Sequence, residues 1–243
     1  PVSILLSGVL LKMGAYGLIR AAETLPAALL ATQDWLAALA FVSLLYGGIL
    51  AWRQQDLKAM IAYSSISHMG IVLLGIATLN VTGLTGAVMQ MVAHGLTAAA
   101  LFMVVGLLYQ RTHSRNLADY GSLVAKAPRF AVFFAFALLA AVGLPGSAGF
   151  VAEVHALVGG FQRWGGWLVL VSLAVLIGAA YSLRVLGRFC GRGQAMTIAD
   201  LSRSESAGAA VLAAGILGLG LWPAPLLHLV AGSVGHLARL FGA

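Results

Sequence analysis

The stretch FAVFFAFALLAAVGLPGSAGFVAEVHALVGG, residues 130–160, combines a long apolar run with signals that interrupt a helix. The run is longer than the roughly 20 residues that an α-helix needs to cross a lipid bilayer. Pro145 lacks a backbone donor, and Gly143, Gly146 and Gly149 loosen the same turn. We therefore expect a membrane-spanning helix that is broken near Pro145.

A break of this kind has two interpretations. Non-helical backbone at membrane depth is tolerated only against protein or a water-filled cavity, so it often marks a functional site. Many Gly-Pro kinks are nevertheless purely structural. Glu153 lies about a turn and a half beyond the break and favours the functional interpretation.

The rest of the chain is equally apolar. Of its 243 residues, 61% are hydrophobic and 9% are charged, whereas soluble domains carry about 25% charged residues. So few charges cannot cover a water-facing surface, and lipid offers no partner to an unpaired backbone. We predict an all-α polytopic membrane bundle of about seven transmembrane helices. The hydrophobic segments are 2–19, 36–52, 59–78, 84–110, 130–158, 165–187 and 207–222.

These segments form one membrane domain, residues 1–222, followed by a short segment, 223–243, that begins with Pro223. The final segment is predicted to be an interfacial amphipathic helix or an additional packed helix. Residues 1–19 lack a basic flank and a small-residue cleavage site, so they are not a signal peptide. They look like a span entered partway through a longer chain.

Basic residues predict the orientation. The loops after the second, fourth and sixth segments contain more lysine and arginine than the opposite loops and should therefore be cytoplasmic. This orientation places the C-terminus in the periplasm. The predicted cytoplasmic loops contain Arg53, Lys58, Arg111, Arg115, Lys126, Arg129, Arg188, Arg192 and Arg203, whereas the opposite loops contain Arg20 and Arg163.

Several classes of site are not expected. The net charge of +7 is spread over short loops, which argues against nucleic-acid binding. Cys190 is the only cysteine, so no cysteine-based metal site can form. The sequence lacks a GxxxxGK[ST] phosphate loop, HExxH and GxSxG, and we expect neither a metal nor a cofactor in this chain.

Four ionisable residues lie well inside the predicted spans: Lys12, His68, His94 and Glu153. A charge at mid-bilayer costs about 2.5–3.5 kcal/mol on insertion scales, so such groups usually face the bundle interior and mark an ion path. Purely structural roles are the alternatives: a packed lysine, a hydrogen-bonded carboxyl group and satisfied core histidines.

Two of these residues have polar neighbours at helical spacing. Gln90 and Thr97 lie on the same helix face as His94, which can relay protons near neutral pH. Ser64 and Ser65 lie one turn before His68 and could carry a chain of water molecules. Lys58, at the start of that helix, is either a positive-inside anchor or a proton-entry residue. His113 and His155 are expected to be structural.

Four stretches resemble one protein family. They are PVSILLSGVLLKMGAYGLIR (1–20), DLKAMIAYSSISHMGIVLLGI (56–76), GAVMQMVAHGLTAAALF (86–102) and GLPGSAGFVAE (143–153). Together they resemble the antiporter-like membrane subunits of respiratory complex I, in the branch of bacterial chain M and mitochondrial subunit 4. Ala98 and Ala99 favour this branch, because chains L and N tend to have a lysine nearby. Glu153 does too, because chain L carries a lysine there.

The resemblance implies a place for each residue. Members of the family have fourteen core helices in two inverted repeats, and this chain resembles the C-terminal half, helices eight to fourteen. Lys12 then matches the central lysine of helix eight, and His68 and His94 match the histidines of helices ten and eleven. Glu153 matches the glutamate of broken helix twelve, on the proton exit side.

Two departures accompany the resemblance. The helix-five glutamate and helix-seven lysine of the family would lie upstream of Pro1, so we expect a fragment, a split gene product or a truncated protein. His155 stands where the family usually has an apolar residue, which is either neutral or alters the solvation of Glu153.

The implied function is that of a proton-translocating subunit of an NADH–quinone oxidoreductase, a translocase, without redox chemistry in this chain. Protons would pass from Lys12 through His94 and His68 to Glu153. Flavin, iron–sulfur clusters and quinone are expected in partner subunits, and chain L-like and chain N-like subunits as neighbours. The expected location is the bacterial inner membrane, with the organellar inner membrane or thylakoid as alternatives.

Two rival functions stay open at this point. One is a subunit of a multisubunit cation–proton antiporter or of a membrane-bound hydrogenase. The other is an inactive half-module.

Overall fold

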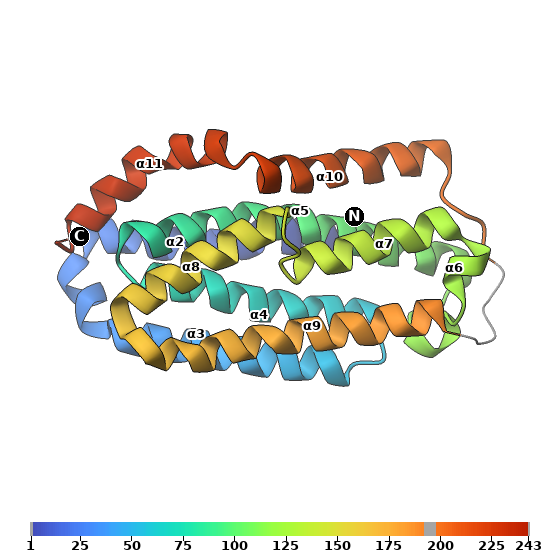
Figure 1. The fold of residues 1–243 in the computed structure, drawn as a ribbon, viewed down its shortest axis with the longest axis horizontal. Helices are drawn as coiled ribbons and strands as arrows, with labels where there is room; N and C mark the ends of the chain where they lie inside the picture. Colours follow the sequence, from blue (N-terminus) through green and yellow to red (C-terminus); the bar gives the residue numbers. More distant parts are fainter. Residues whose placement is uncertain (1, 192–197, 243) are drawn as a thin grey trace.

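The computed structural model describes residues 2–191 and 198–242, and its helices lie side by side along one long axis (Figure 1). The long helices are α2 (Leu11–Thr24), α3 (Pro26–Arg53), α4 (Leu57–Ala77), α5 (Val81–Thr112), α7 (Pro128–Ala141), α8 (Ala148–Trp164), α9 (Leu168–Cys190), α10 (Arg203–Leu221) and α11 (Ala224–Arg239). The short ones are α1 (Val2–Leu5), a π-helical turn η1 (Leu6–Leu10), η2 (Leu117–Asp119), α6 (Leu123–Lys126) and η3 (Gly165–Trp167).

The predicted fold class, an all-α polytopic membrane bundle, is confirmed. Each predicted hydrophobic segment coincides with a helix, and the fifth is divided into α7 and α8. Within the described residues, 6 stretches are long and apolar enough to cross a membrane, with Ala148–Cys190 counted as one. Arg192, one of the residues used to predict orientation, lies outside the described residues.

One helix boundary differs clearly from the prediction. Helix α3 begins at Pro26, whereas its hydrophobic segment was predicted to begin at residue 36. The polar residues Gln33 and Asp34 interrupt the apolar pattern but not the helix. Gln33 is buried, donates to the carbonyl of Ala77 at 2.8 Å and accepts from Arg163 at 2.7 Å. A tertiary partner therefore stabilises a polar residue that hydropathy places in a loop.

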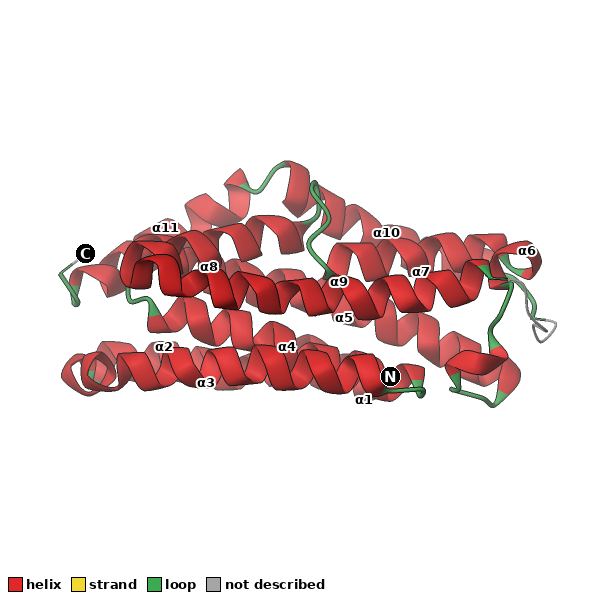
Figure 2. Ribbon diagram, turned by 60° about the horizontal axis from the view of Figure 1, so that its bottom comes forward, coloured by secondary structure: helices red, strands yellow, loops and turns green. Residues whose placement is uncertain are grey.

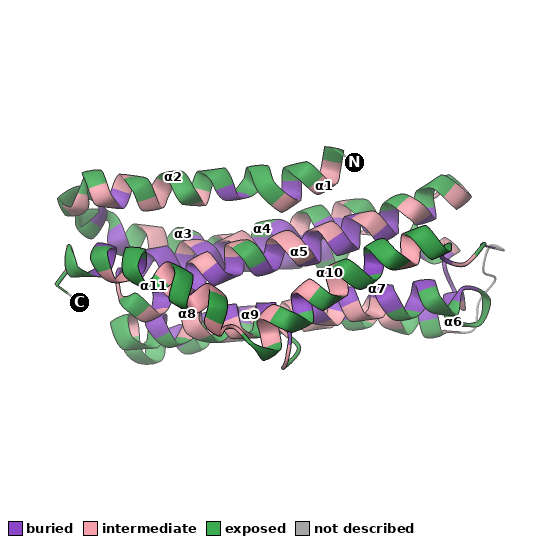
Figure 3. Cartoon of the chain, turned by 90° about the horizontal axis from the view of Figure 1, so that it is seen from above, coloured by how far each residue is buried: buried purple, intermediate pink, exposed green. Residues whose placement is uncertain are grey.

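Helices α4 and α5 form the buried centre, and α1 and α2 lie along one flank with most of their residues exposed (Figure 3). The central helices meet at glycines. A Cβ atom on Gly86 of α5 would overlap the backbone of Ala156 on α8, and one on Gly159 of α8 would overlap Gly83 of α5. Backbone contact of this kind is how membrane helices pack without a hydrophobic driving force between them.

The predicted break in the fifth segment spans residues 142–147, near the middle of the bundle's length (Figure 2). Gly143 and Gly146 adopt φ of +79° and +92°, a region that strains any residue with a Cβ. Ser147 then caps α8 by accepting a hydrogen bond from the backbone N–H of Phe150. Helix α10 covers the break, because Gly220 lies directly against the backbone of Gly146. The irregular backbone therefore packs against protein on the side of α10, whereas Leu144 and Pro145 within the break are exposed.

The final segment forms helix α11, which follows α10 along the same face of the bundle (Figure 1). Its residues Val234, Leu237 and Ala238 pack in one apolar cluster with Ala22 and Leu84. The end of this helix therefore packs against the bundle, and the choice between an interfacial helix and an additional packed helix stays a prediction.

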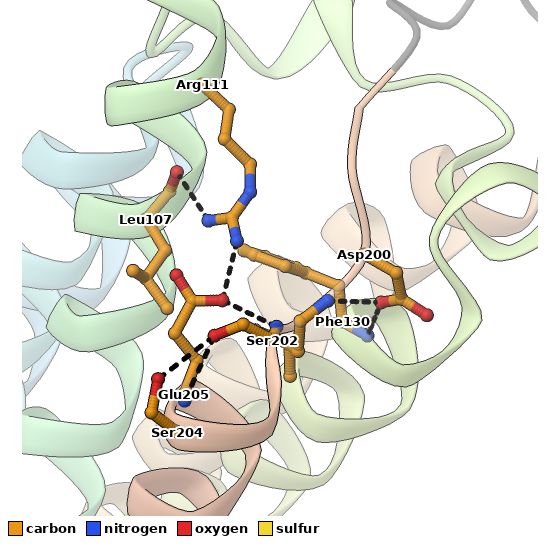
Figure 4. A network of polar contacts seen from close by, with 8 residues as sticks. Leu107, Arg111, Phe130, Asp200, Ser202, Ser204 and Glu205 are labelled. Carbon is orange, nitrogen blue, oxygen red and sulfur yellow. Dashed lines mark hydrogen bonds and ion pairs between the residues drawn. The ribbon is translucent and has the colours of Figure 1, made fainter.

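A polar network at the end of α5 ties α10 to α5 and α7 (Figure 4). Arg111 forms an ion pair of 2.6 Å with Glu205, which also completes a capping box with Ser202. Asp200 accepts hydrogen bonds from the backbone N–H groups of Arg129 and Phe130 at the start of α7, whose own N-cap residue offers no side-chain bond. Partial burial would raise the pKa of Asp200, but these donors, that of Leu201 and the Arg129 charge outweigh burial and lower it.

Gly86→Ala should destabilise the bundle by about 1–3 kcal/mol, because its Cβ would overlap the Ala156 backbone of α8. Gly106→Ala on the same helix is the matched control, since nothing lies within 4 Å of its Cβ position. Thermal unfolding of the detergent-solubilised protein measures both. Equal midpoints for the two variants would contradict the proposed close packing of α5 on α8.

Asp200→Ala should destabilise the start of α7 by about 0.5–2 kcal/mol, the usual cost of losing a helix cap. Because the Asp200 pKa is lowered in the folded state, its contribution is complete at neutral pH and is lost as the pH falls through that lowered pKa. The decrease in the free energy of unfolding caused by Asp200→Ala, measured by chemical unfolding, should therefore be smaller in acid than at neutral pH. Ser204→Ala, an exposed neighbour in the same network, serves as the control.

Candidate functional site

The structure brings the four predicted ionisable residues into one buried cluster. Lys12 lies on α2, His68 on α4, His94 on α5 and Glu153 on α8. Their exposed fractions are 8%, 7%, 4% and 6%. Residues separated by more than 140 positions in the sequence therefore share one enclosed polar interior.

Lys12 turns toward the bundle although its helix neighbours face outward. Its ammonium donates a hydrogen bond to Nδ1 of His94 at 2.7 Å and another to the carbonyl oxygen of Ser7. Val9 and Met13 are each 58% exposed. The helix thus presents large apolar side chains outward and the Lys12 ammonium inward, as expected where the surroundings are lipid.

The cluster continues from His94 to Glu153 through His68. The imidazole rings of His94 and His68 lie 5.4 Å apart between centroids and are tilted by 44°. Nδ1 of His68 lies 3.7 Å from Oε1 of Glu153, an ion-pair distance when His68 is protonated. Each step passes from one helix to its neighbour, so the order is Lys12, His94, His68 and Glu153.

The Glu153 carboxylate lies against the helix break. A Cβ atom on Gly143 would come within 2.7 Å of Oε2 of Glu153, so only glycine leaves room for the carboxylate. Tyr181 of α9 is buried near Ser64 and Glu153. The break therefore both bends the helix and opens the position that the carboxylate occupies.

Further polar groups surround the two histidines. Gln90 and Thr97 are buried beside His94, as the helical spacing predicted, and Ser64 donates to the Ile61 carbonyl one turn before His68. Nε2 of His68 and Oε1 of Gln90 are buried without a partner from the described residues. Buried polar atoms that lack a protein partner are commonly satisfied by internal water.

Three other predicted residues lie outside the cluster. Lys58 is exposed at the start of α4, where Asp56 caps the helix. His155 bonds the Val151 carbonyl of its own helix at 2.7 Å, and His113 follows the end of α5 in a left-handed conformation. The structural roles expected for the last two agree with these positions.

Sequence patterns did not identify Ser7 and Tyr181. Ser7 is buried in the π-helical turn, and Tyr181 lies in a helix that also contains Ser172 and Ser182. A single serine or tyrosine in a span is common, and neither has a spacing that distinguishes it. Ser147 could have been found, because a serine directly after the Gly-Leu-Pro-Gly break and before an apolar run is a helix-cap signal.

The ionisable groups of the cluster are close enough for their charges to affect one another. Within the described residues, no group of three or more His, Cys, Asp or Glu side chains is placed to hold an ion. Two like charges about 4 Å apart repel by about 4 kcal/mol at an effective dielectric constant of about 20. Lys12 and His94 would therefore not both carry a positive charge. Protonating one group changes the proton affinity of the next.

Comparison with known proteins places the chain in a family. Residues 1–178 match the family model described as NADH:quinone oxidoreductase/Mrp antiporter, transmembrane. The chain belongs to this family. Over 247 residues it is 39% identical to NADH-quinone oxidoreductase subunit M of Rhodobacter capsulatus, a match that covers 99% of this chain and 48% of that protein. It is 37% identical over 243 residues to NADH-ubiquinone oxidoreductase chain 4 of Chondrus crispus, covering 98% and 49%.

Solved structures share the fold. A chain in the structure of respiratory complex I from Thermus thermophilus with bound NADH is similar, with a TM-score of 0.90 and 30% identity over 96% of this chain and 50% of that one. The Mrp complex from Dietzia sp. contains a chain with a TM-score of 0.87 at 20% identity, covering 97% and 53%, which shows the fold alone. The chain spans about half the length of the curated relatives it matches.

The contact between Gly143 and Glu153 can be tested by a double-mutant cycle. Gly143→Ala and Gly146→Ala both place alanine at positive φ, which costs roughly 1–2 kcal/mol. Only Gly143→Ala also displaces the Glu153 carboxylate. The extra destabilisation of Gly143→Ala, measured by unfolding, should therefore diminish in a Glu153→Ala background, whereas that of Gly146→Ala should not change. An unchanged cost for both would argue against the contact.

Proposed function

We propose that this chain is a proton-translocating membrane subunit of an NADH–quinone oxidoreductase, acting as part of that translocase. The observation that carries the proposal is the buried series of Lys12, His94, His68 and Glu153, which crosses the bundle through α2, α5, α4 and α8. Membership of the family and likeness to chain M relatives support it.

Proton transfer would proceed along this series. Lys12 shares a hydrogen bond with Nδ1 of His94, so a proton on either group is held by the same pair. A proton that reaches His68 is stabilised by the Glu153 carboxylate 3.7 Å away. The step between the two imidazoles requires a water molecule or a turn of one ring, because the ring centroids are 5.4 Å apart.

Charge coupling gives the series a direction. A proton on Lys12 repels one on His94, whereas the Glu153 carboxylate attracts a proton toward His68. Release from Glu153 would restore the starting charges. The helix break beside Glu153 supplies the irregular backbone at which a group near the membrane middle can meet water.

The proposal includes the surroundings of the chain. Redox chemistry, with flavin, iron–sulfur clusters and quinone, would belong to partner subunits, and chain L-like and chain N-like subunits would be neighbours. The chain would lie in a bacterial inner membrane, with the start of α4 at the cytoplasmic side and the C-terminus in the periplasm. The upstream lysine of the family would deliver protons to Lys12.

Lys12→Ala and Glu153→Ala should each slow proton transfer through this subunit by about 10²-fold or more, the usual effect of removing a proton-transfer group. Proton pumping per NADH oxidised, measured in vesicles containing the intact complex, tests this. His155→Ala is the matched control on α8, because His155 bonds its own helix backbone. Wild-type stoichiometry in both Lys12→Ala and Glu153→Ala would refute the proposal.

A cation–proton antiporter or hydrogenase subunit is the rival, favoured by the fold shared with the Mrp complex chain. Purification of the complex through an affinity tag on this chain distinguishes the oxidoreductase from its rival. Co-eluting subunits that contain flavin and iron–sulfur clusters and oxidise NADH support the oxidoreductase. A set of purely membrane-embedded partners, with no redox centre, would support the antiporter. An inactive half-module would copurify with neither.

A further inference from the structure

The π-helical turn η1 changes which residue faces Lys12. In an α-helix with 3.6 residues per turn, positions five apart point about 140° away from each other. A turn with i→i+5 geometry brings them to one face. Ser7 is accordingly buried, and its carbonyl oxygen accepts a hydrogen bond from the Lys12 ammonium five residues later.

Ser7 also connects α4 to Lys12. Its hydroxyl group lies 3.0 Å from that of Ser65, and both residues are buried, with exposed fractions of 5% and 2%. Ser65 lies two helical turns after Lys58, so the two side chains share one face of α4. The series Lys58, Ser65, Ser7 and Lys12 therefore runs from the exposed start of α4 to the buried cluster.

A cavity follows the same series. Lys58, Ser65, Ser7 and Phe102 are among the residues that line a space of about 210 Å³ between η1, α4 and α5. Lys58 and Phe102 also line a second cavity of about 560 Å³, which contains Arg115 in its wall. One water molecule occupies about 30 Å³ in the liquid, so the volume admits water, and Ser3, Ser7, Lys58 and Ser65 are the polar residues that could bind it there.

The two serines by themselves have a simpler explanation. Hydroxyl groups often join membrane helices by hydrogen bonds. That role needs neither a cavity beside the two serines nor a cation at the outer end of the series. The serine pair, the cavity and Lys58 occur together and lead to the Lys12 ammonium, which fits a path for water and protons.

We propose that Lys12 exchanges protons directly with the aqueous phase at the start of α4, along an entry lane formed by Lys58, Ser65 and Ser7. The proposal rests on the proton-transfer role proposed for Lys12 and adds a second source of protons to the upstream lysine. Lys58 lies at the mouth of the lane, and the serine hydroxyl groups orient water inside it.

Accessibility tests the lane independently of pumping. Ser65→Cys and Ser7→Cys, in a Cys190→Ser background of the intact complex, are exposed to a water-soluble cationic methanethiosulfonate in vesicles of both orientations. Both cysteines should react from the side at which α4 begins and not from the other. Adding Ala62→Phe, which fills the smaller cavity, should slow the reaction at least about tenfold.

Ser67→Cys is the matched control. Ser67 is equally buried on α4, but its hydroxyl group donates to the Leu44 carbonyl and it is not among the residues lining either cavity. It should stay unreactive from both sides. A lack of reaction at both Ser65→Cys and Ser7→Cys, or equal reaction from the two sides, would overturn the lane.

Pumping then separates the two proposals. Ala62→Phe should slow pumping at least about twofold if the lane carries protons, and Ser67→Ala should not change it. Loss of pumping in Lys12→Ala, with unreactive cysteines, would overturn the lane and leave the proposed function standing. Wild-type pumping in Lys12→Ala and Glu153→Ala would instead overturn the proposed function, whatever the accessibility.

Discussion

The close approach of α4, α5 and α8 is the constraint on which the rest of the structure depends. Glycines at the contacts, among them Gly75, Gly83, Gly86 and Gly159, bring the helix backbones together where any side chain would separate them. Because the imidazole and carboxylate groups are short, an increase of one or two ångströms between these helices would break the series from His94 to Glu153. Packing between small residues thus determines the geometry of the charged ones.

Lipid as a solvent reverses the usual relation between burial and polarity. In α2 the buried residues are Lys12 and Ala22, while large apolar side chains face outward. An ammonium group in lipid is costly, so the free energy of finding partners orients the helix. The break between α7 and α8 also packs against protein on one side, where Gly220 of α10 lies against the backbone of Gly146.

Much of this could be predicted from the sequence, because the signals are local. Span lengths follow from runs of apolar residues, and the break follows from Gly143, Pro145 and Gly146 within a few positions. Lys12, His68, His94 and Glu153 were identifiable because charges inside apolar runs are rare. Gln33 and Ser7 were not. The hydrogen-bond partners that stabilise Gln33 inside the bundle come from distant parts of the chain, and Ser7 is buried in a π-helical turn that no residue type marks.

The sequence by itself therefore determined that the chain is an all-helical membrane bundle, that one helix is broken, and which ionisable residues are buried in it. The family resemblance implied the order Lys12, His94, His68 and Glu153, but only the tertiary structure shows the contacts between successive residues and the contact between Ser65 and Ser7. These contacts depend on which helices are neighbours and how they are rotated. Those properties arise from packing between residues far apart in the chain, which a pattern within one segment does not contain.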